Sequence, residues 1–351
     1  AFGRVAEWLD LRWRRAAVWA LASSGPLPKH VALIMDGNRR YARLKGLDPT
    51  DGHRCGYDKL IWALRWCSDV GIRHVSVYAF SVDNFRRSVS EVSAMMRLAA
   101  EKLDNLLEDL SGVQRWDVAV RIIGNLGLLP EDVQRSAARL MRATQHHKGG
   151  VLNICFAYTG SEDMLQASTA VSEAVDVGLL EEADVTDRLM EQCLHTAGCP
   201  PVDLLVRTSG ETRLSDFMLW QASYAELVFL RVLWPQVTFL HMCVSILRFQ
   251  RTAAENARRR DRNREQLEAC ERAADEAHVR AELEWHRRSR TGGGEAADPA
   301  SGVAAASTAR TGGGSVSGAG LCEACASGDS PSLRACSRAG LGKQANEEAE
   351  R

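Results

Sequence analysis

Short apolar runs that alternate with helical patterns constrain the fold of this chain more than any other feature. Most runs are continuous rather than alternating, which is typical of strands buried on both faces of a sheet. The six runs are His30–Met35, Val75–Phe80, Val118–Ile123, Leu152–Ala157, Val202–Val206 and Leu227–Leu230. The helical stretches between them are Tyr57–Val70, Ser90–Leu110, Glu131–His147 and Glu162–Val177. This order predicts a single α/β domain with a mostly parallel central sheet flanked by helices.

Composition divides the chain into four segments. Residues 1–25 have tryptophans opposite arginines and predict an amphipathic helix, and residues 26–250 carry the α/β pattern. Residues 251–290 predict a charged helical extension. Residues 291–351 are rich in Gly, Ala and Ser, and such a tail buries too little apolar surface to fold. The net charge of −1 gives no argument for nucleic acid, and we expect none to bind.

Cysteine usage and hydropathy indicate a reduced protein without a membrane span. No apolar run approaches the roughly 20 residues that a spanning helix needs, and no secretory signal is visible. The CxxC of Cys322 and Cys325 lies in the Gly-rich tail without the packed context of a zinc site. Cysteines in apolar or helical surroundings are expected to be reduced core residues. They are Cys67, Cys155, Cys193 and Cys243.

Polar and cationic residues follow three of the predicted strands. In a parallel sheet, ligands bind outside the carboxyl ends of the strands. The first run ends in Asp36-Gly37-Asn38-Arg39-Arg40, the second continues through residues 80–87, and the fifth through residues 207–213. We therefore expect these side chains to gather at one edge of the sheet.

The residue types at this edge indicate a diphosphate bound with a divalent cation. Arginine forks suit phosphate oxygens, and Arg40, Arg87, Arg207 and Arg213 could converge there. Asp36 repels phosphate unless it holds a cation that bridges to the phosphate oxygens. The alternative is that these arginines form ordinary surface ion pairs.

Motifs of several other α/β enzyme classes are absent. The sequence has no GxxxxGK[ST] phosphate loop, no GxGxxG after the first strand and no GxSxG elbow. These absences argue against a nucleotide kinase, a Rossmann dehydrogenase and an α/β-hydrolase.

Three segments resemble the signatures of cis-prenyltransferases. The first is residues 30–42, the second is Tyr78-Ala79-Phe80-Ser81 with Asn84, Phe85 and Arg87, and the third is residues 203–217. Leu219-Trp220-Gln221, Tyr224-Ala225-Glu226 and Val232-Leu233-Trp234-Pro235 continue the third. The resemblance spans about residues 27–250. The Arg39-Arg40-Tyr41 variant and the long C-terminal helix resemble the eukaryotic dehydrodolichyl diphosphate synthase type more than the bacterial undecaprenyl type.

The resemblance implies cis-prenyl chain elongation, in which isopentenyl diphosphate is added to an allylic diphosphate, such as farnesyl diphosphate, for dolichol-type carrier lipids. Asp36 would hold Mg²⁺, and Glu226 matches a position that supports the metal. Residues implied to cradle the allylic diphosphate are Gly37, Asn38, Arg39, Arg40 and Arg87. Residues implied to bind the isopentenyl diphosphate are Arg207, Arg213 and Ser215. Residues implied near the reacting carbons, as candidates for assisting proton removal, are His53, Ser81 and Asn84. Phe80 and Phe85 would line the prenyl site.

The growing chain needs an apolar tunnel, and the predicted helix Ser90–Leu110 could form one wall of it. Its apolar residues have helical spacing, which equally suits an ordinary core helix. The residues concerned are Val92, Met95, Met96, Leu98, Leu103 and Leu106.

Two departures from the family pattern concern activity and assembly. Pro49 stands where homomeric members carry an arginine, and no Arg-x-Gly segment follows Phe249. Members of the eukaryotic type share the second absence, and a Nogo-B-receptor-type accessory subunit supplies the segment. We therefore expect a dimer, a heteromer with such a subunit, peripherally attached to the cytoplasmic face of the endoplasmic reticulum membrane through the N-terminal helix. The alternatives are a helix docked on its own domain, a non-catalytic scaffold subunit of the same fold, and an unrelated phosphate-binding α/β enzyme.

Overall fold

The structure is a computed structural model that describes residues 2–111, 117–181 and 184–290. The predicted tail of residues 291–351, with Cys322 and Cys325, lies outside the described residues. The chain forms two compact units. One comprises Ala1–Ser168 with Leu194–Arg260, and the other comprises Thr169–Cys193 with the chain from Asp261 onward. The first unit contains the whole sheet and all of the predicted site residues.

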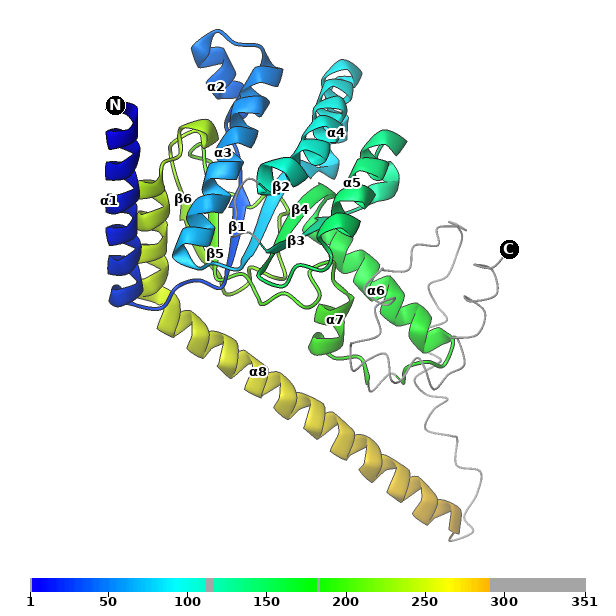
Figure 1. Cartoon of the computed structure of the whole chain (residues 1–351). Coiled ribbons are helices and arrows are strands. Elements are labelled where there is room, and N and C mark those ends of the chain that lie inside the picture. Colours follow the sequence, from blue (N-terminus) through cyan, green and yellow to red (C-terminus); the bar gives the residue numbers. More distant parts are fainter. Residues whose placement is uncertain (1, 112–116, 182–183, 291–351) are drawn as a thin grey trace. The chain divides into compact units, whose positions relative to one another are not determined.

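A six-stranded sheet forms the centre of the first unit, and every strand pairing is parallel, as the sequence predicted (Figure 1). The strand order is β3-β4-β2-β1-β5-β6. The strands are β1 His30–Ile34, β2 His74–Ser81, β3 Val118–Ile123, β4 Gly150–Tyr158, β5 Leu204–Arg207 and β6 Glu226–Phe229. The predicted runs match them within a few residues, because continuous burial is a local property of the sequence.

Helices cover one face of this sheet and loop residues cover the other. The helices on this face include α3 Pro49–Val70, α4 Val89–Ser111 and α5 Glu131–Thr144. Helix α2 Asn38–Lys45 packs on α3, and the short helices are η1 Val82–Arg86, η2 Leu126–Leu128 and η4 Trp234–Gln236. Val31 and Leu33 of β1 belong to the larger apolar core, which includes residues of α3, α4 and α5. Ala32, between them, points to the opposite face, where Phe217 and Met218 cover it. Both faces of β1 are therefore buried.

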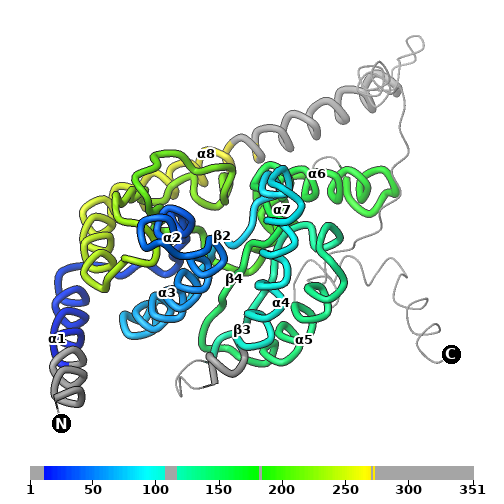
Figure 2. The backbone as a smooth tube through the Cα atoms, turned by 90° about the horizontal axis from the view of Figure 1, so that it is seen from above, coloured from blue at the N-terminus to red at the C-terminus, as the bar shows by residue number. Residues whose placement is uncertain are grey.

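Within the first unit, the N-terminal helix α1 (Phe2–Ser24) packs beside the start of α8 (Phe239–Arg290), as Figures 1 and 2 show. The Trp13 ring lies 5.4 Å from the Phe239 ring, and Gln250 Nε2 donates to the Leu21 carbonyl at 2.8 Å. Leu21 is buried, whereas Trp19 is 73% exposed. The helix therefore docks on its own domain, which was the alternative to membrane attachment. Trp19 is nevertheless exposed on the docked helix.

The second unit contains the C-terminal part of α6 (Gly160–Asp176) and the whole of α7 (Asp187–Cys193). Helix α8 runs without a break through residue 250, where composition predicted a boundary, so the four-segment division stays a prediction. Within the described residues, no helix is both long and apolar enough to cross a bilayer. Cys67, Cys155 and Cys243 are free and buried, as expected, while Cys193 is free but only half-buried.

Candidate active site

The strand order brings the ends of β1 and β5 together at the point where the connections change direction. Ile34 pairs with Arg207, the last residue of β5, and Asp36 follows two residues later. Arg207 Nη2 donates to Asp36 Oδ2 at 3.0 Å. These residues are 171 positions apart in the chain, and only the parallel pairing of β1 with β5 joins them. A crevice at such a point is the usual ligand site of an open α/β sheet.

Arg207 is a buried cation fixed from three sides. It is 4% exposed, and Nη1 donates to the Arg213 carbonyl at 2.6 Å and to Ser215 Oγ at 2.7 Å. A buried guanidinium is unfavourable without a counter-charge, and Asp36 supplies one. Its Nε is buried and has no partner within the described part of the chain. The family resemblance predicts one binding site for Arg207, Arg213 and Ser215. The structure places these three residues in contact with one another.

The segment from Ser209 to Met218 is strained and firmly held. Four non-glycine residues in it have positive φ, among them Ser209 at 77° and Ser215 at 53°. Such conformations persist only where the surroundings fix them. Ser209 N donates to the Val232 carbonyl at 2.8 Å, and Tyr78 Oη donates to the Ser215 carbonyl at 3.2 Å. The segment therefore presents Arg213 from a preformed backbone.

Gly37 and Asn38 form the turn that opens α2. Gly37 has φ 109°, and a Cβ there would lie 2.9 Å from Leu233 Cδ2, so only glycine fits. Asn38 is the first residue of α2, and its Oδ1 is buried without a partner in the described residues. The unpaired N–H groups of a helix start favour an anion. The positions predicted to cradle a diphosphate thus form a helix N-terminus beside Asp36.

Glutamates hold the remaining predicted arginines. Glu91 Oε1 accepts from Arg39 Nη1 at 3.3 Å and from Arg87 Nη1 at 2.9 Å. Arg40 Nη2 donates to Glu211 Oε1 at 3.2 Å. The sequence motifs did not point to Glu91 or Glu211 as site residues. Glu91 lies four residues after Arg87, at the start of the predicted helix, and this spacing was the signal that could have identified it.

His53 of α3 lies half-buried among these charges. Its pKa is lowered to about 4, chiefly by burial; the nearby Arg87 and Arg39 also lower it, and Glu91 opposes them. The imidazole is therefore neutral near pH 7 and can accept a proton. A diphosphate bound beside it would oppose the effect of the arginines and raise this pKa.

Ser81 and Asn84 cap the short helix η1. Asn84 Oδ1 accepts from the Ser81 N–H at 3.1 Å, and Ser81 Oγ accepts from the Asp83 N–H at 3.1 Å. This reciprocal cap has a structural purpose of its own. Their predicted part in proton removal stays a prediction.

Aromatic rings continue from η1 into an apolar groove. The rings of Phe80 and Phe85 meet edge to face at 4.9 Å, and Phe80 stacks on Phe156 at 5.4 Å. A groove of about 520 Å³ lies beside Phe85. Its apolar lining is Phe85, Val92, Met96, Leu128, Leu129 and Pro130.

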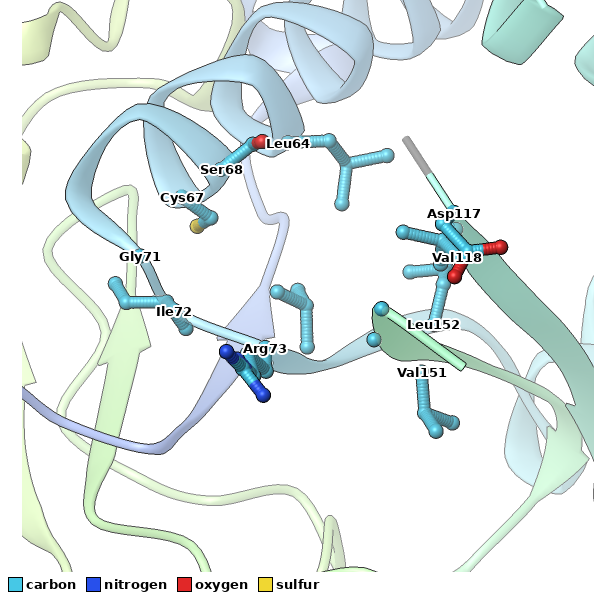
Figure 3. A pocket seen from close by; sticks show the side chains of 13 residues that line it. Leu64, Cys67, Ser68, Gly71, Ile72, Arg73, Asp117, Val118, Val151 and Leu152 are labelled. Carbon is cyan, nitrogen blue, oxygen red and sulfur yellow. The ribbon is translucent and has the colours of Figure 1, made fainter. Parts of the chain in front are cut away.

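A second hollow of about 160 Å³ lies at the other end of the sheet (Figure 3). It is lined by Leu64, Val118 and Leu152, near the amino ends of β3 and β4, with Arg73 and Asp117 also in the lining. The helix α4 residues Met96, Leu103 and Leu106 are buried in the core that includes Leu64 and Leu152. The two hollows thus adjoin the same apolar core, and a tunnel through it remains a prediction.

Glu226 lies away from Asp36 within this chain. It is the first residue of β6 and pairs with Leu204, whereas Arg207 pairs with Phe229. Three residues along a strand span about 10 Å. Glu226 Oε2 instead accepts from Thr252 Oγ1 at 2.8 Å. Its predicted part in metal binding is not supported by this placement and stays a prediction.

Asp36 has the donor chemistry that Mg²⁺ prefers. Its side chain is partly exposed, and Oδ1 has no protein donor among the described residues. No group of three or more His, Cys, Asp or Glu residues in that part of the chain could form a metal cage. Mg²⁺ commonly binds through one or two carboxylates plus substrate phosphates and water, so Asp36 fits it.

The carboxylate of Asp36, the buried Arg207 and the N-terminus of α2 lie together where the connections of the parallel sheet change direction. This arrangement is typical of α/β enzymes that act on phosphorylated substrates. The comparisons with known proteins make this specific. A family model described as "Putative undecaprenyl diphosphate synthase" matches residues 34–258. The chain therefore belongs to this family of cis-prenyltransferases, which join isopentenyl diphosphate to an allylic diphosphate.

Individual relatives agree with this assignment. The chain is 44% identical over 269 residues to "Dehydrodolichyl diphosphate synthase complex subunit Dhdds" of Mus musculus, covering 75% of this chain and 81% of that protein. It is 39% identical to "Tritrans,polycis-undecaprenyl-diphosphate synthase (geranylgeranyl-diphosphate specific)" of Methanopyrus kandleri, covering 65% and 83%. The crystal structure of lavandulyl diphosphate synthase from Lavandula x intermedia in complex with dimethylallyl diphosphate matches with a TM-score of 0.60 at 31% identity, covering 64% and 95%. A scaffold role is not needed to explain these residues.

Proposed function

We propose that this enzyme uses Mg²⁺ to extend farnesyl diphosphate into a long-chain polyprenyl diphosphate for dolichol-type glycosyl carrier lipids. The contact between Asp36 and Arg207 carries the proposal, because it joins the two predicted diphosphate sites. The printed names of the mouse and Methanopyrus relatives support a polyprenyl product.

The allylic diphosphate would bind over the start of α2. The N–H groups of this helix start, with Arg39, Arg40 and Arg87 beside them, stabilise the charge that develops on the departing diphosphate. Mg²⁺ held by Asp36, when bound, neutralises further charge on the same group.

The isopentenyl diphosphate would bind at the preformed segment after β5. Arg207 is fixed by Asp36, Ser215 and the Arg213 carbonyl, and Arg213 itself is 65% exposed and can reach a ligand. The double bond of this substrate attacks the allylic carbon, and a proton is then lost. His53 is neutral near pH 7 and is our candidate acceptor, with Ser81 and Asn84 holding the adjoining turn.

An apolar surface on β6 and α8 supports assembly as a dimer, with an accessory subunit of the Nogo-B-receptor type. Leu240, Val244 and Leu247 follow helical spacing on α8, and all three are exposed. Leu227 is also exposed on β6, which is an edge strand. The mouse relative is itself named as a subunit of a complex. A missing Arg-x-Gly segment supplied by the partner would complete the isopentenyl site.

The exposed face of α1 supports peripheral contact with the endoplasmic reticulum membrane at its cytoplasmic side. Trp19 is exposed on a helix that carries several arginines, a composition typical of interfacial helices. A long apolar product also favours synthesis next to a bilayer.

The test is incorporation of labelled isopentenyl diphosphate onto farnesyl diphosphate with Mg²⁺, with and without the accessory subunit. Asp36→Asn keeps an oxygen for Arg207 and removes the charge, so we expect at least about a 100-fold loss of rate with an unchanged melting temperature. Asp104→Ala removes an exposed carboxylate paired with Arg139 and serves as the control.

Full activity of Asp36→Asn would refute the site. Full-rate turnover by the chain alone, unaffected by added partner, would refute the heteromer and leave the enzyme assignment intact.

A further inference from the structure

Glu211 contacts one arginine from each of the two predicted diphosphate sites. Its Oε1 accepts from Arg40 Nη2 at 3.2 Å, and its Oε2 accepts from Arg213 Nη1. Arg40 belongs to the allylic site after β1, and Arg213 to the isopentenyl site after β5. Neither the sequence motifs nor the comparisons assign a role to this carboxylate.

The Arg40 side of this contact is built into the fold. Arg40 also donates to the Ser209 carbonyl at 3.2 Å and to Ser209 Oγ at 2.8 Å. Ser209 and Gly210 both have positive φ, and backbone hydrogen bonds to Val232 and Leu230 fix them. The carboxylate of Glu211 is therefore carried by a rigid turn that Arg40 itself helps to hold.

Each guanidinium keeps donors for a ligand while it is bound to Glu211. An arginine has five N–H donors in a planar fork, and Glu211 takes one nitrogen from each partner. Phosphate oxygens can bind the remaining donors without breaking the contacts to the carboxylate. The two arginines are thus linked through one carboxylate, with free donors on each.

We propose that Glu211 is a positioning residue that couples the two diphosphate sites. A diphosphate bound to Arg40 orders the chain from Arg40 through Glu211 to Arg213, so the second diphosphate meets an arginine whose position is already fixed. Ordering that is shared between two sites makes the binding of each ligand favour the other. The inference rests on the proposed function, because it requires both sites.

This coupling matters for elongation as well as for a single condensation. After each condensation, the lengthened chain carries the diphosphate that entered with isopentenyl diphosphate. That diphosphate must move to the allylic site before the next addition. Glu211 lies between the two arginines that would release and receive it.

A second carboxylate offers a comparison within one site. Glu91 also bridges two arginines, Arg39 and Arg87, but both belong to the allylic side. Loss of Glu91 should change the affinity for the allylic ligand without abolishing coupling to the isopentenyl site. Glu211 is the carboxylate whose contacts join one side to the other.

The experiment measures binding of isopentenyl diphosphate by calorimetry, with and without farnesyl thiodiphosphate, a poorly reactive allylic analogue. It uses the full chain with any subunit that turnover requires, in the presence of Mg²⁺. In the unsubstituted protein we expect the analogue to tighten isopentenyl diphosphate binding at least fivefold. In Glu211→Gln we expect this factor to fall below two, while each ligand alone binds within about threefold of its original affinity.

Glu131→Gln is the matched control, since it alters an exposed carboxylate paired with Arg135 and should leave the factor unchanged. A factor that is the same in Glu211→Gln and the unsubstituted protein, or no coupling in the unsubstituted protein, would overturn the inference alone. Absence of binding by either diphosphate to the unsubstituted protein would overturn the proposed function instead.

Discussion

Gly56 of α3 shapes the predicted diphosphate site, because it has no side chain. A Cβ at this position would lie 2.4 Å from Asn38 Oδ1, closer than real contacts allow. Its carbonyl accepts from Trp234 Nε1 at 2.8 Å, which ties α3 to η4. The helix therefore approaches the start of α2 closely enough to fix the Asn38 side chain.

Gly56→Ala should separate activity from stability. Alanine favours a helix interior by about 1 kcal/mol over glycine, which offsets part of the clash. Asn38 must move, so we expect KM for the allylic diphosphate to rise at least fivefold while the melting temperature falls only slightly.

Steady-state kinetics and thermal unfolding measure the two effects of this substitution. The control is Gly127→Ala, where the added Cβ meets Asn125 at an ordinary 3.5 Å. An unchanged KM in Gly56→Ala would show that Asn38 does not hold the substrate.

At the scale of elements, α1 presents two kinds of surface. Leu21 is buried, and its carbonyl accepts from Gln250 of α8, whereas Trp19, two residues earlier, projects into solvent. Because neighbouring residues on one helix face opposite directions, docking and membrane contact can be tested separately.

Leu21→Ala should lower the free energy of unfolding by about 2–4 kcal/mol, because it leaves a cavity between α1 and the sheet unit. Trp19→Ala should leave it within about 0.5 kcal/mol and weaken binding to anionic lipid vesicles. Urea unfolding and vesicle sedimentation measure the two quantities. Equal vesicle binding by Trp19→Ala would remove the membrane role of this helix face.

At the scale of the molecule, a buried row of polar side chains crosses three strands of the sheet. The His30 ring is fully buried; its Nδ1 lies 2.7 Å from the Pro200 carbonyl, so Nδ1 carries the proton and donates. Nε2 must then accept from Ser76 Oγ at 2.8 Å, and Ser76 accepts from Asn153 Nδ2 at 3.0 Å. This order of donors requires a neutral imidazole.

Acid should therefore destabilise the protein. Burial lowers the pKa of His30 to about 4 from 6.5, so the unfolded chain binds more protons between these values. The stability that His30 contributes is complete above pH 6.5 and is lost as the pH falls through 4. A shift of this size corresponds to about 3 kcal/mol, and the half-buried His53 acts in the same direction.

Urea unfolding at a series of pH values tests this expectation. The free energy of unfolding should fall between pH 6.5 and 4, and the fall should be shallower in His30→Gln. An identical pH dependence in this variant would show that His30 is not the group responsible.

The sequence by itself determined the parallel α/β architecture and predicted the edge of the sheet at which ligands would bind. Burial of a strand on both faces gives a continuous apolar run in the sequence. Parallel strands then place residues 36–40 and 207–213 at the same carboxyl edge of the sheet, and the pairing of β1 with β5 makes them neighbours. The distinct spacing of these motifs also identified the family. These features depend on local pattern and on one topological rule, so they needed no coordinates.

Only the tertiary structure decided which charges oppose the arginines. Glu211 reaches Arg40 across 171 residues of sequence, and Glu226 lies at the start of its strand rather than beside Asp36. Strand register and helix packing set such distances, and a motif does not encode them. The docking of Leu21 against α8 depends in the same way on surfaces that exist only after both helices have formed.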